Sequence, residues 1–128
     1  MAKAMRKLMR AEQDLADGFP EEAASRSYYA AFHAVTALLA TRGLSYSSHT
    51  QVIGAFSREF VKTGVLPNVL SRQLRQLFED RQTADYDWVT TIDAQTATDA
   101  VAAAKALIAH CQEEISRPGH GETDQAGA

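Results

Sequence analysis

Residues 25–41, SRSYYAAFHAVTALLAT, decide the fold of this chain. Side chains recur there at the three- and four-residue spacing that lines one face of a helix: Tyr28, Phe32, Val35 and Leu39. Alanine and other apolar residues fill most of the remaining positions, so the predicted helix is apolar on nearly every side. Such a helix packs against partners on several sides. We therefore predict that this segment is the central helix of a small bundle.

The flanking segments carry the signals of four further helices. Apolar stripes bounded by glycine, proline or capping residues predict these helices over residues 2–16, 49–63, 67–83 and 94–116, and the same signals extend the central helix over residues 20–42. Pro67 is expected as the first residue of the fourth helix, and Arg81 is expected off its apolar stripe. Short links favour antiparallel neighbours. The predicted fold class is therefore all-α, a five-helix antiparallel up-and-down bundle.

Length and composition place the chain among ordinary globular domains. It has 128 residues, a net charge of -3 and one cysteine, which allows one domain and no internal disulfide. We expect the bundle to cover residues 1–116 and the polar segment 117–128 to be a disordered tail. The first residues contain no continuous apolar run, so we expect neither a signal peptide nor a membrane partner, and a cytoplasmic location.

Familiar catalytic signatures are absent from the sequence. It contains no phosphate-binding P-loop, no dinucleotide-binding glycine motif, no HExxH zinc motif and no GxSxG nucleophile motif. No histidine has a glutamate three residues before it, as the carboxylate-bridged di-iron bundles require. We therefore expect no metal site and no cofactor.

A group of polar side chains marks the predicted end of the fourth helix. Arg81, Asp85 and Tyr86 combine a fixed positive charge, a carboxylate and a phenol within six residues. Arg81 and Asp85 are four residues apart, so they can form a local ion pair. They can equally form a small site that binds a phosphate or the carboxylate of a partner. Both interpretations remain open at this point.

Three further side chains are candidates for the site. Tyr29 can present its hydroxyl at the edge of the central helix, and His33 on the same helix is either a packing histidine or a catalytic one. His49 lies in the first turn of the predicted third helix, where the positive end of the helix dipole lowers a histidine pKa. It is either a poised base or a packing residue.

The order of these residues resembles the HEPN domain family (higher eukaryotes and prokaryotes nucleotide-binding). The resemblance rests on the pair Tyr28 and Tyr29, on His49 after a serine, and on Arg81 followed by Ala-Asp-Tyr86. It extends over residues 5–115 and is closest to the small stand-alone prokaryotic members. It implies a helical bundle, a homodimer, and in many members a minimal nucleotidyltransferase as partner in a toxin–antitoxin system.

The ribonuclease members of that family imply a specific site. There an arginine is followed, after four to six residues, by a histidine that cleaves RNA without a metal, and in some pairs a tyrosine two residues later is modified. In this sequence Tyr86 stands at the first allowed histidine position and Trp88 at the corresponding tyrosine position. Only Arg81 carries over. A tyrosine with an ordinary pKa near ~10 is a poor base at neutral pH.

Two literal arginine–histidine matches lie elsewhere in the chain, Arg26 with His33 and Arg42 with His49. The numbers of arginines and histidines make about one such match expected by chance, so neither carries weight by itself.

Three functions are compatible with this sequence. The first is a degenerate HEPN protein, a dimeric partner of a nucleotidyltransferase that binds through Tyr29, His49, Arg81, Asp85 and Tyr86. The second is an active endoribonuclease with RNA as substrate, in which Arg81 works with Tyr86 or with a histidine that folding brings within hydrogen-bond reach, His33 or His49. The third, a tetratricopeptide-like peptide-binding scaffold, lacks a second copy of the repeat.

Overall fold

The computed structural model describes residues 1–87 and 90–117. Trp88 and all of the predicted tail except Arg117 lie outside this range. The described residues form five α-helices and one π-helical turn: α1 (Ala2–Ala16), α2 (Pro20–Ala40), α3 (His49–Phe56), η1 (Ser57–Val61), α4 (Asn68–Tyr86) and α5 (Ala94–Ser116). The predicted all-α fold class is confirmed.

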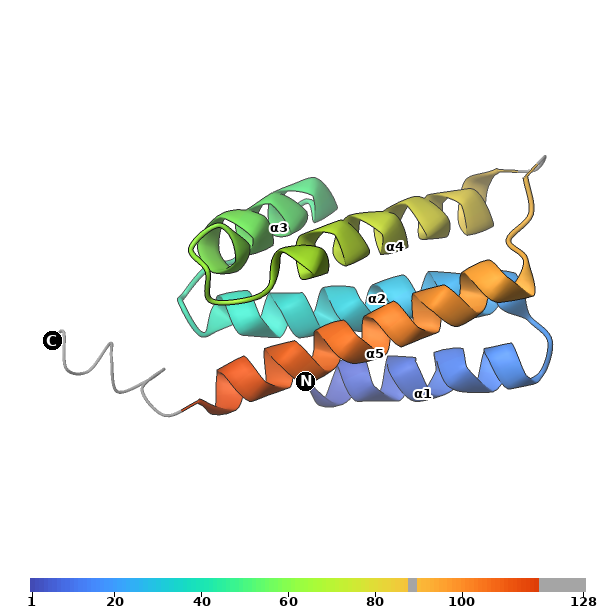
Figure 1. The fold of residues 1–128 in the computed structure, drawn as a ribbon, viewed down its shortest axis with the longest axis horizontal. Helices are drawn as coiled ribbons and strands as arrows, with labels where there is room; N and C mark the ends of the chain where they lie inside the picture. Colours follow the sequence, from blue (N-terminus) through green and yellow to red (C-terminus); the bar gives the residue numbers. More distant parts are fainter. Residues whose placement is uncertain (88–89, 118–128) are drawn as a thin grey trace, which may run out of the picture.

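Helix α2 is the centre of the bundle, as its all-round apolar character predicts. It contacts each of the other four α-helices, and α1, α2, α4 and α5 run alternately up and down beside one another (Figure 1). The short α3 lies alongside the half of the bundle where α2 finishes and α4 begins, and it contacts both helices (Figure 1). Tyr28, Val35 and Leu39 of α2 are buried in the common core. Fully buried alanines in α1, α2 and α5 let these helices approach closely: Ala4, Ala11, Ala23, Ala24, Ala30, Ala31, Ala34, Ala97 and Ala104.

The helix starts follow the capping signals with one exception. The Ser48 side chain accepts a hydrogen bond from the Gln51 amide at 3.1 Å, and Asp93 accepts one from the Thr96 amide at 2.8 Å. Pro67 is not the first helical residue, as the sequence led us to expect. Its ψ of 145° is extended, so it takes the N-cap position and α4 begins at Asn68.

Two helix ends differ from the prediction in ways that matter for the site. The third helix changes to π-helical spacing at Ser57, where the Lys62 amide donates to the Ser57 carbonyl at 2.8 Å. Helix α4 does not fade at residue 83 but continues to Tyr86, and the Asp87 amide still donates to the Thr83 carbonyl at 3.1 Å. Arg81, Asp85 and Tyr86 therefore all project from regular helix.

Candidate functional site

Arg81 lies on the apolar side of α4, and the expectation that it lies off the stripe is wrong. The buried side chains Leu70, Leu74 and Leu77 are followed by Arg81 at the same four- and three-residue spacing, so the guanidinium continues their row toward α2. Only 13% of its side chain is exposed. The stripe signal was present in the sequence, but a cation in the fourth place of an apolar row conceals it.

The guanidinium of Arg81 is held between tyrosines and one carboxylate. It donates a hydrogen bond to the Tyr29 hydroxyl at 2.5 Å, and its Nε lies 3.1 Å from Asp85 Oδ2. The Tyr86 hydroxyl lies 3.4 Å away, and the Arg81 Cζ is 5.2 Å from the centre of the Tyr29 ring and 5.3 Å from that of Tyr86. Burial alone would lower the pKa of Arg81, but the Tyr29 hydrogen bond and the neighbouring acidic groups raise it. Arg81 is therefore a fixed positive charge.

His49 of α3 reaches the tyrosine pair of α2, Tyr28 and Tyr29. Its Nδ1 shares a hydrogen bond of 2.8 Å with the hydroxyl of Tyr28, and its ring stacks on Phe32 with the two centres 4.3 Å apart. Burial and, next, the charge of Arg81 lower the pKa of His49. Burial raises the pKa of Tyr28, which Arg81 partly opposes. Near neutral pH, the site therefore pairs an uncharged phenol with an uncharged imidazole.

Two side chains from other helices, His49 of α3 and Arg81 of α4, thus meet at the tyrosine pair of α2. Tyr28 and Tyr29 of α2 contact each other edge to face at 5.4 Å between ring centres, and His49 and Arg81 approach them from α3 and α4. A guanidinium in a poorly solvated place can bind a phosphate or carboxylate strongly, and a neutral imidazole can accept a proton. Among the described residues, no direct hydrogen bond joins Arg81 to His49.

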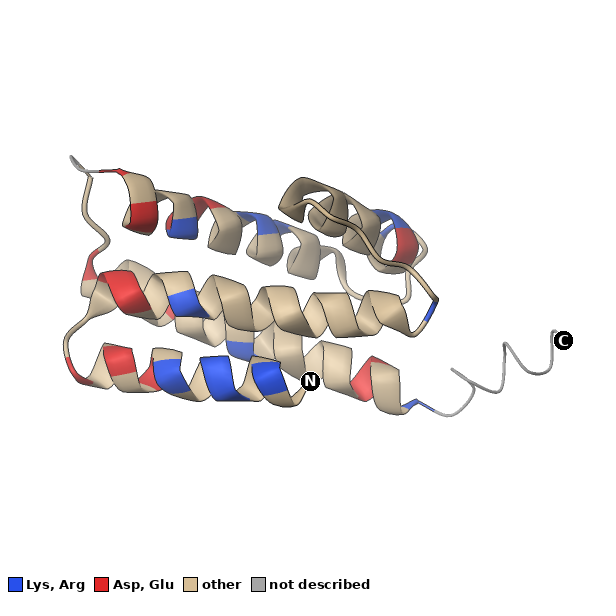
Figure 2. Cartoon of the chain, turned by 180° about the vertical axis from the view of Figure 1, so that it is seen from behind, with Lys and Arg blue, Asp and Glu red and all other residues tan. Residues whose placement is uncertain are grey.

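The structure does not bring His33 to Arg81. Burial lowers the pKa of His33, and so do the positive charges of Lys3, Lys7 and the N-terminus, which places it beside α1. Figure 2 shows lysine and arginine residues following one another along the first half of α1. His33 was a candidate catalytic residue because it shares a helix with the tyrosine pair. It meets a different neighbour because it lies about 140° around α2 from Tyr28.

Neither literal arginine–histidine match forms a site. Arg26 pairs with Asp14 of α1. Arg42 donates to the Glu59 carbonyl at 2.9 Å and lies over the Phe60 ring at 4.1 Å from its centre. Both arginines therefore have structural partners other than the histidine that the spacing would assign to them.

The pKa of His49 offers a direct check on this geometry. In a histidine titration followed by NMR, we expect His49 to titrate below about 6.5, the ordinary value. Since the folded state binds this proton less readily than the unfolded state, His49 makes the protein lose stability as the pH falls below that value. Arg81→Gln should raise the pKa of His49 part of the way, because burial remains, and should leave His33 unchanged.

The matched control is Lys7→Gln, which should raise the pKa of His33 and leave His49 unchanged. A response of both histidines to both variants would contradict the separate environments described above.

Residues 1–87 and 90–117 carry neither a metal cluster nor a membrane span. No group of three or more histidine, cysteine, aspartate or glutamate side chains lies close enough there to hold a metal ion. Within the same residues, none of the helices combines the length and apolar character needed to cross a bilayer.

Known proteins share much of this sequence. The chain is 40% identical over 86 residues to a UPF0332 protein of Thermotoga maritima, an alignment that covers 67% of this chain and 65% of that protein. It is 36% identical over 95 residues to a protein of Methanocaldococcus jannaschii named "Putative toxin MJ0142", with 74% and 65% covered. The chain therefore spans less than two thirds of the length of either relative. Residues 1–115 match the HEPN domain, and this chain belongs to the HEPN domain family.

Proposed function

We propose that this chain is the HEPN half of a toxin–antitoxin-like pair and acts as a dimeric binding partner of a minimal nucleotidyltransferase in the cytoplasm. Membership of the HEPN family and relatives that are named as toxins support the pairing. The observation that carries the binding role is the arrangement at Arg81. The motif position after Arg81 holds Tyr86, whose hydroxyl lies 3.4 Å from the guanidinium, and Asp85 Oδ2 lies 3.1 Å from Arg81 Nε, so the motif holds an anion-binding group but no histidine.

The binding role is tested by affinity capture from the source organism. The tagged wild-type chain should be a dimer by light scattering and should retain a nucleotidyltransferase identified by mass spectrometry. Folded Arg81→Gln should lose that protein, whereas Arg58→Gln, an exposed arginine of η1, should retain it. Capture that is independent of Arg81, or a monomer that binds no nucleotidyltransferase, would contradict the proposal.

A second function, a metal-independent endoribonuclease, is favoured by one specific observation. Folding brings His49 from α3 to the tyrosine pair that also holds Arg81, and both burial and Arg81 keep its pKa low. A histidine from outside the motif could then supply the general base, with Arg81 stabilising the phosphate. The missing motif histidine would not by itself abolish cleavage.

An RNA cleavage assay in the presence of a chelator separates the two functions. Cleavage by the wild-type chain that is lost in both Arg81→Gln and His49→Gln, but retained in His33→Gln, would establish the ribonuclease. His33 is the matched control, because it lies on the α1 side of α2 and its replacement changes the same residue type. No cleavage above a buffer control would exclude the ribonuclease and leave the binding role.

A further inference from the structure

A groove of about 220 Å³ lies between the middle of α4 and the first half of α5. Its apolar wall combines Leu77 of α4 with Ala100 and Ala103 of α5, of which the first two are buried. Its polar wall consists of side chains from both helices: Gln73, Gln76, Asp80 and Asp99. Asp80 and Arg81 are adjacent in sequence and so point about 100° apart around α4. The groove is therefore separate from the Arg81 site.

Asp80 is a buried carboxylate on the polar wall of this groove. It is 9% exposed, and the Gln76 amide donates to its Oδ1 at 2.9 Å. None of the described lysine or arginine residues forms an ion pair with it. Burial raises the pKa of Asp80, the Gln76 hydrogen bond opposes this, and the charges of Glu79 and Asp99 add to it. Burying such a charge is costly unless a partner compensates it.

Gln73 provides a second and independent sign that a donor is missing. Its Oε1 is buried and has no hydrogen-bond partner in the described part of the chain. Gln73 and Asp80 are seven residues apart, which places them on the same side of α4 above the same groove. Buried acceptors in folded proteins are nearly always paired. An unpaired amide oxygen therefore lies beside a carboxylate that has one amide donor but forms no ion pair with a described residue, which leaves room for a donor from outside the chain.

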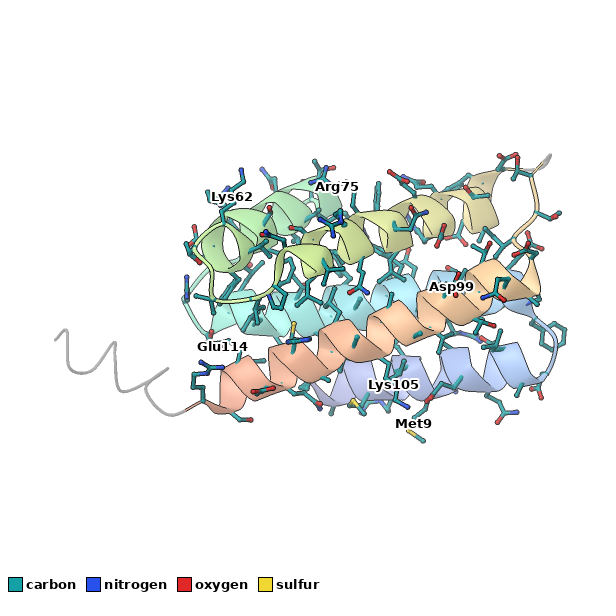
Figure 3. All side chains as sticks on the ribbon, viewed as in Figure 1. Met9, Lys62, Arg75, Asp99, Lys105 and Glu114 are labelled. Atoms are coloured by element: carbon teal, nitrogen blue, oxygen red, sulfur yellow. The ribbon has the colours of Figure 1, made fainter. Side chains whose placement is uncertain are left out.

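The nearby cations of this chain are directed elsewhere. Arg81 is bound to Tyr29 and Asp85. Arg75 is five residues from Asp80, about 140° around the helix. Figure 3 shows Asp99 on the edge of α5 that faces α4 and Lys105 on the edge near α1, where Lys105 lies 3.9 Å from Glu12. The groove thus offers negatively charged hydrogen-bond acceptors, and none of the described residues places a cation in it to pair with them.

We propose that this groove binds an alkyl guanidinium, in the form of an arginine side chain from a partner protein. A guanidinium has five N–H donors in one plane and can bridge the carboxylates of Asp80 and Asp99 and the free oxygen of Gln73. Its alkyl stem fits against the apolar wall. The groove of about 220 Å³ is several times the volume of about 30 Å³ that one molecule occupies in liquid water. It therefore has room for one long side chain. The proposal does not depend on the function proposed for Arg81.

The test is an NMR titration of the full chain with capped arginine (N-acetyl-arginine N-methylamide), agmatine and tetramethylammonium. We expect capped arginine and agmatine to shift the methyl signals of Leu77, Ala100 and Ala103 in a saturable manner. Tetramethylammonium carries the same single charge as capped arginine but has no N–H donor, and it should leave them unchanged. Equal shifts with tetramethylammonium, or binding of agmatine without binding of capped arginine, would overturn the proposal.

Variants assign the binding to the groove. Asp80→Asn should weaken binding of capped arginine at least tenfold, because a charge-assisted bond is lost. Glu79→Gln, the matched control on the exposed side of α4, should change it less than twofold. Without ligand, the thermal midpoint of Asp80→Asn should equal or exceed that of the wild type, because an uncompensated buried charge has been removed.

A second variant keeps the test decisive if Asp80→Asn folds poorly. Gln73→Met removes the unpaired oxygen while keeping the length of the side chain, and it should also weaken binding and raise the thermal midpoint. A lower midpoint in both variants, with binding unchanged in Gln73→Met, would show that these side chains serve only packing.

Discussion

Tyr28→Ala is expected to lower the free energy of unfolding by about 3–5 kcal/mol, as for other large aromatic residues replaced in a core. Tyr28 is fully buried and contacts the rings of Tyr29, Phe32, His49 and Phe78. Truncation would leave a cavity at the junction of α2, α3 and α4. Urea unfolding followed by circular dichroism measures the effect.

Tyr28→Phe separates packing from hydrogen bonding at the same position. It keeps the ring and removes only the hydroxyl that bonds His49 Nδ1, so we expect a loss of about 1–2 kcal/mol. The two variants should therefore differ by at least about 1 kcal/mol. Equal losses would mean that the hydrogen bond, rather than the packed ring, accounts for the role of Tyr28.

Arg81→Gln is expected to weaken the binding of inorganic phosphate at least tenfold. The guanidinium is the only positive group among the side chains shown to meet at the tyrosine pair, and little solvent screens it because 13% of its side chain is exposed. We also expect a loss of stability of about 1–2 kcal/mol, since Asp85 and the Tyr29 hydroxyl lose their partner. Phosphate titration followed on the tyrosine ring signals measures the first effect, and urea unfolding the second.

Arg42→Gln is the matched control for this variant. Arg42 also lies over an aromatic ring and donates to an oxygen, but its partners are Phe60 and the Glu59 carbonyl, away from the tyrosine pair. Its replacement should leave phosphate binding unchanged. Phosphate affinity that falls equally in both variants would show that overall charge, and not the Arg81 site, governs binding.

Much of the fold was predictable because it depends on local signals. The all-round apolar character of residues 25–41 predicts a central helix, and α2 occupies that place. Serine and aspartate caps at Ser48 and Asp93 mark helix starts correctly because a cap is made within three residues. The π-helical turn at Ser57–Val61, which buries Phe60 and Val61, was missed because no local sequence motif marks it.

The site was predictable only in part. The group Arg81, Asp85 and Tyr86 could be recognised because its members lie within one helical turn and a half. His33 was a candidate catalytic residue and His49 a candidate binding residue, and the sequence allowed either to reach Arg81. Only tertiary packing decides between them: α3 against α2 places His49 on Tyr28, and α1 against α2 places His33 beside Lys3 and Lys7.

The sequence by itself thus determined the helices, the apolar central helix, and which residues form the polar group at the end of α4. The tertiary structure decided which histidine meets the pair Tyr28 and Tyr29 next to that group, and that Arg81 points inward. It also placed Gln73 and Asp80 of α4 beside Asp99 of α5. The physical reason is the range of the interactions. Caps, stripes and ion pairs four residues apart act along one helix, whereas burial, ring stacking and charge shifts between helices depend on the direction in which each helix faces its neighbour.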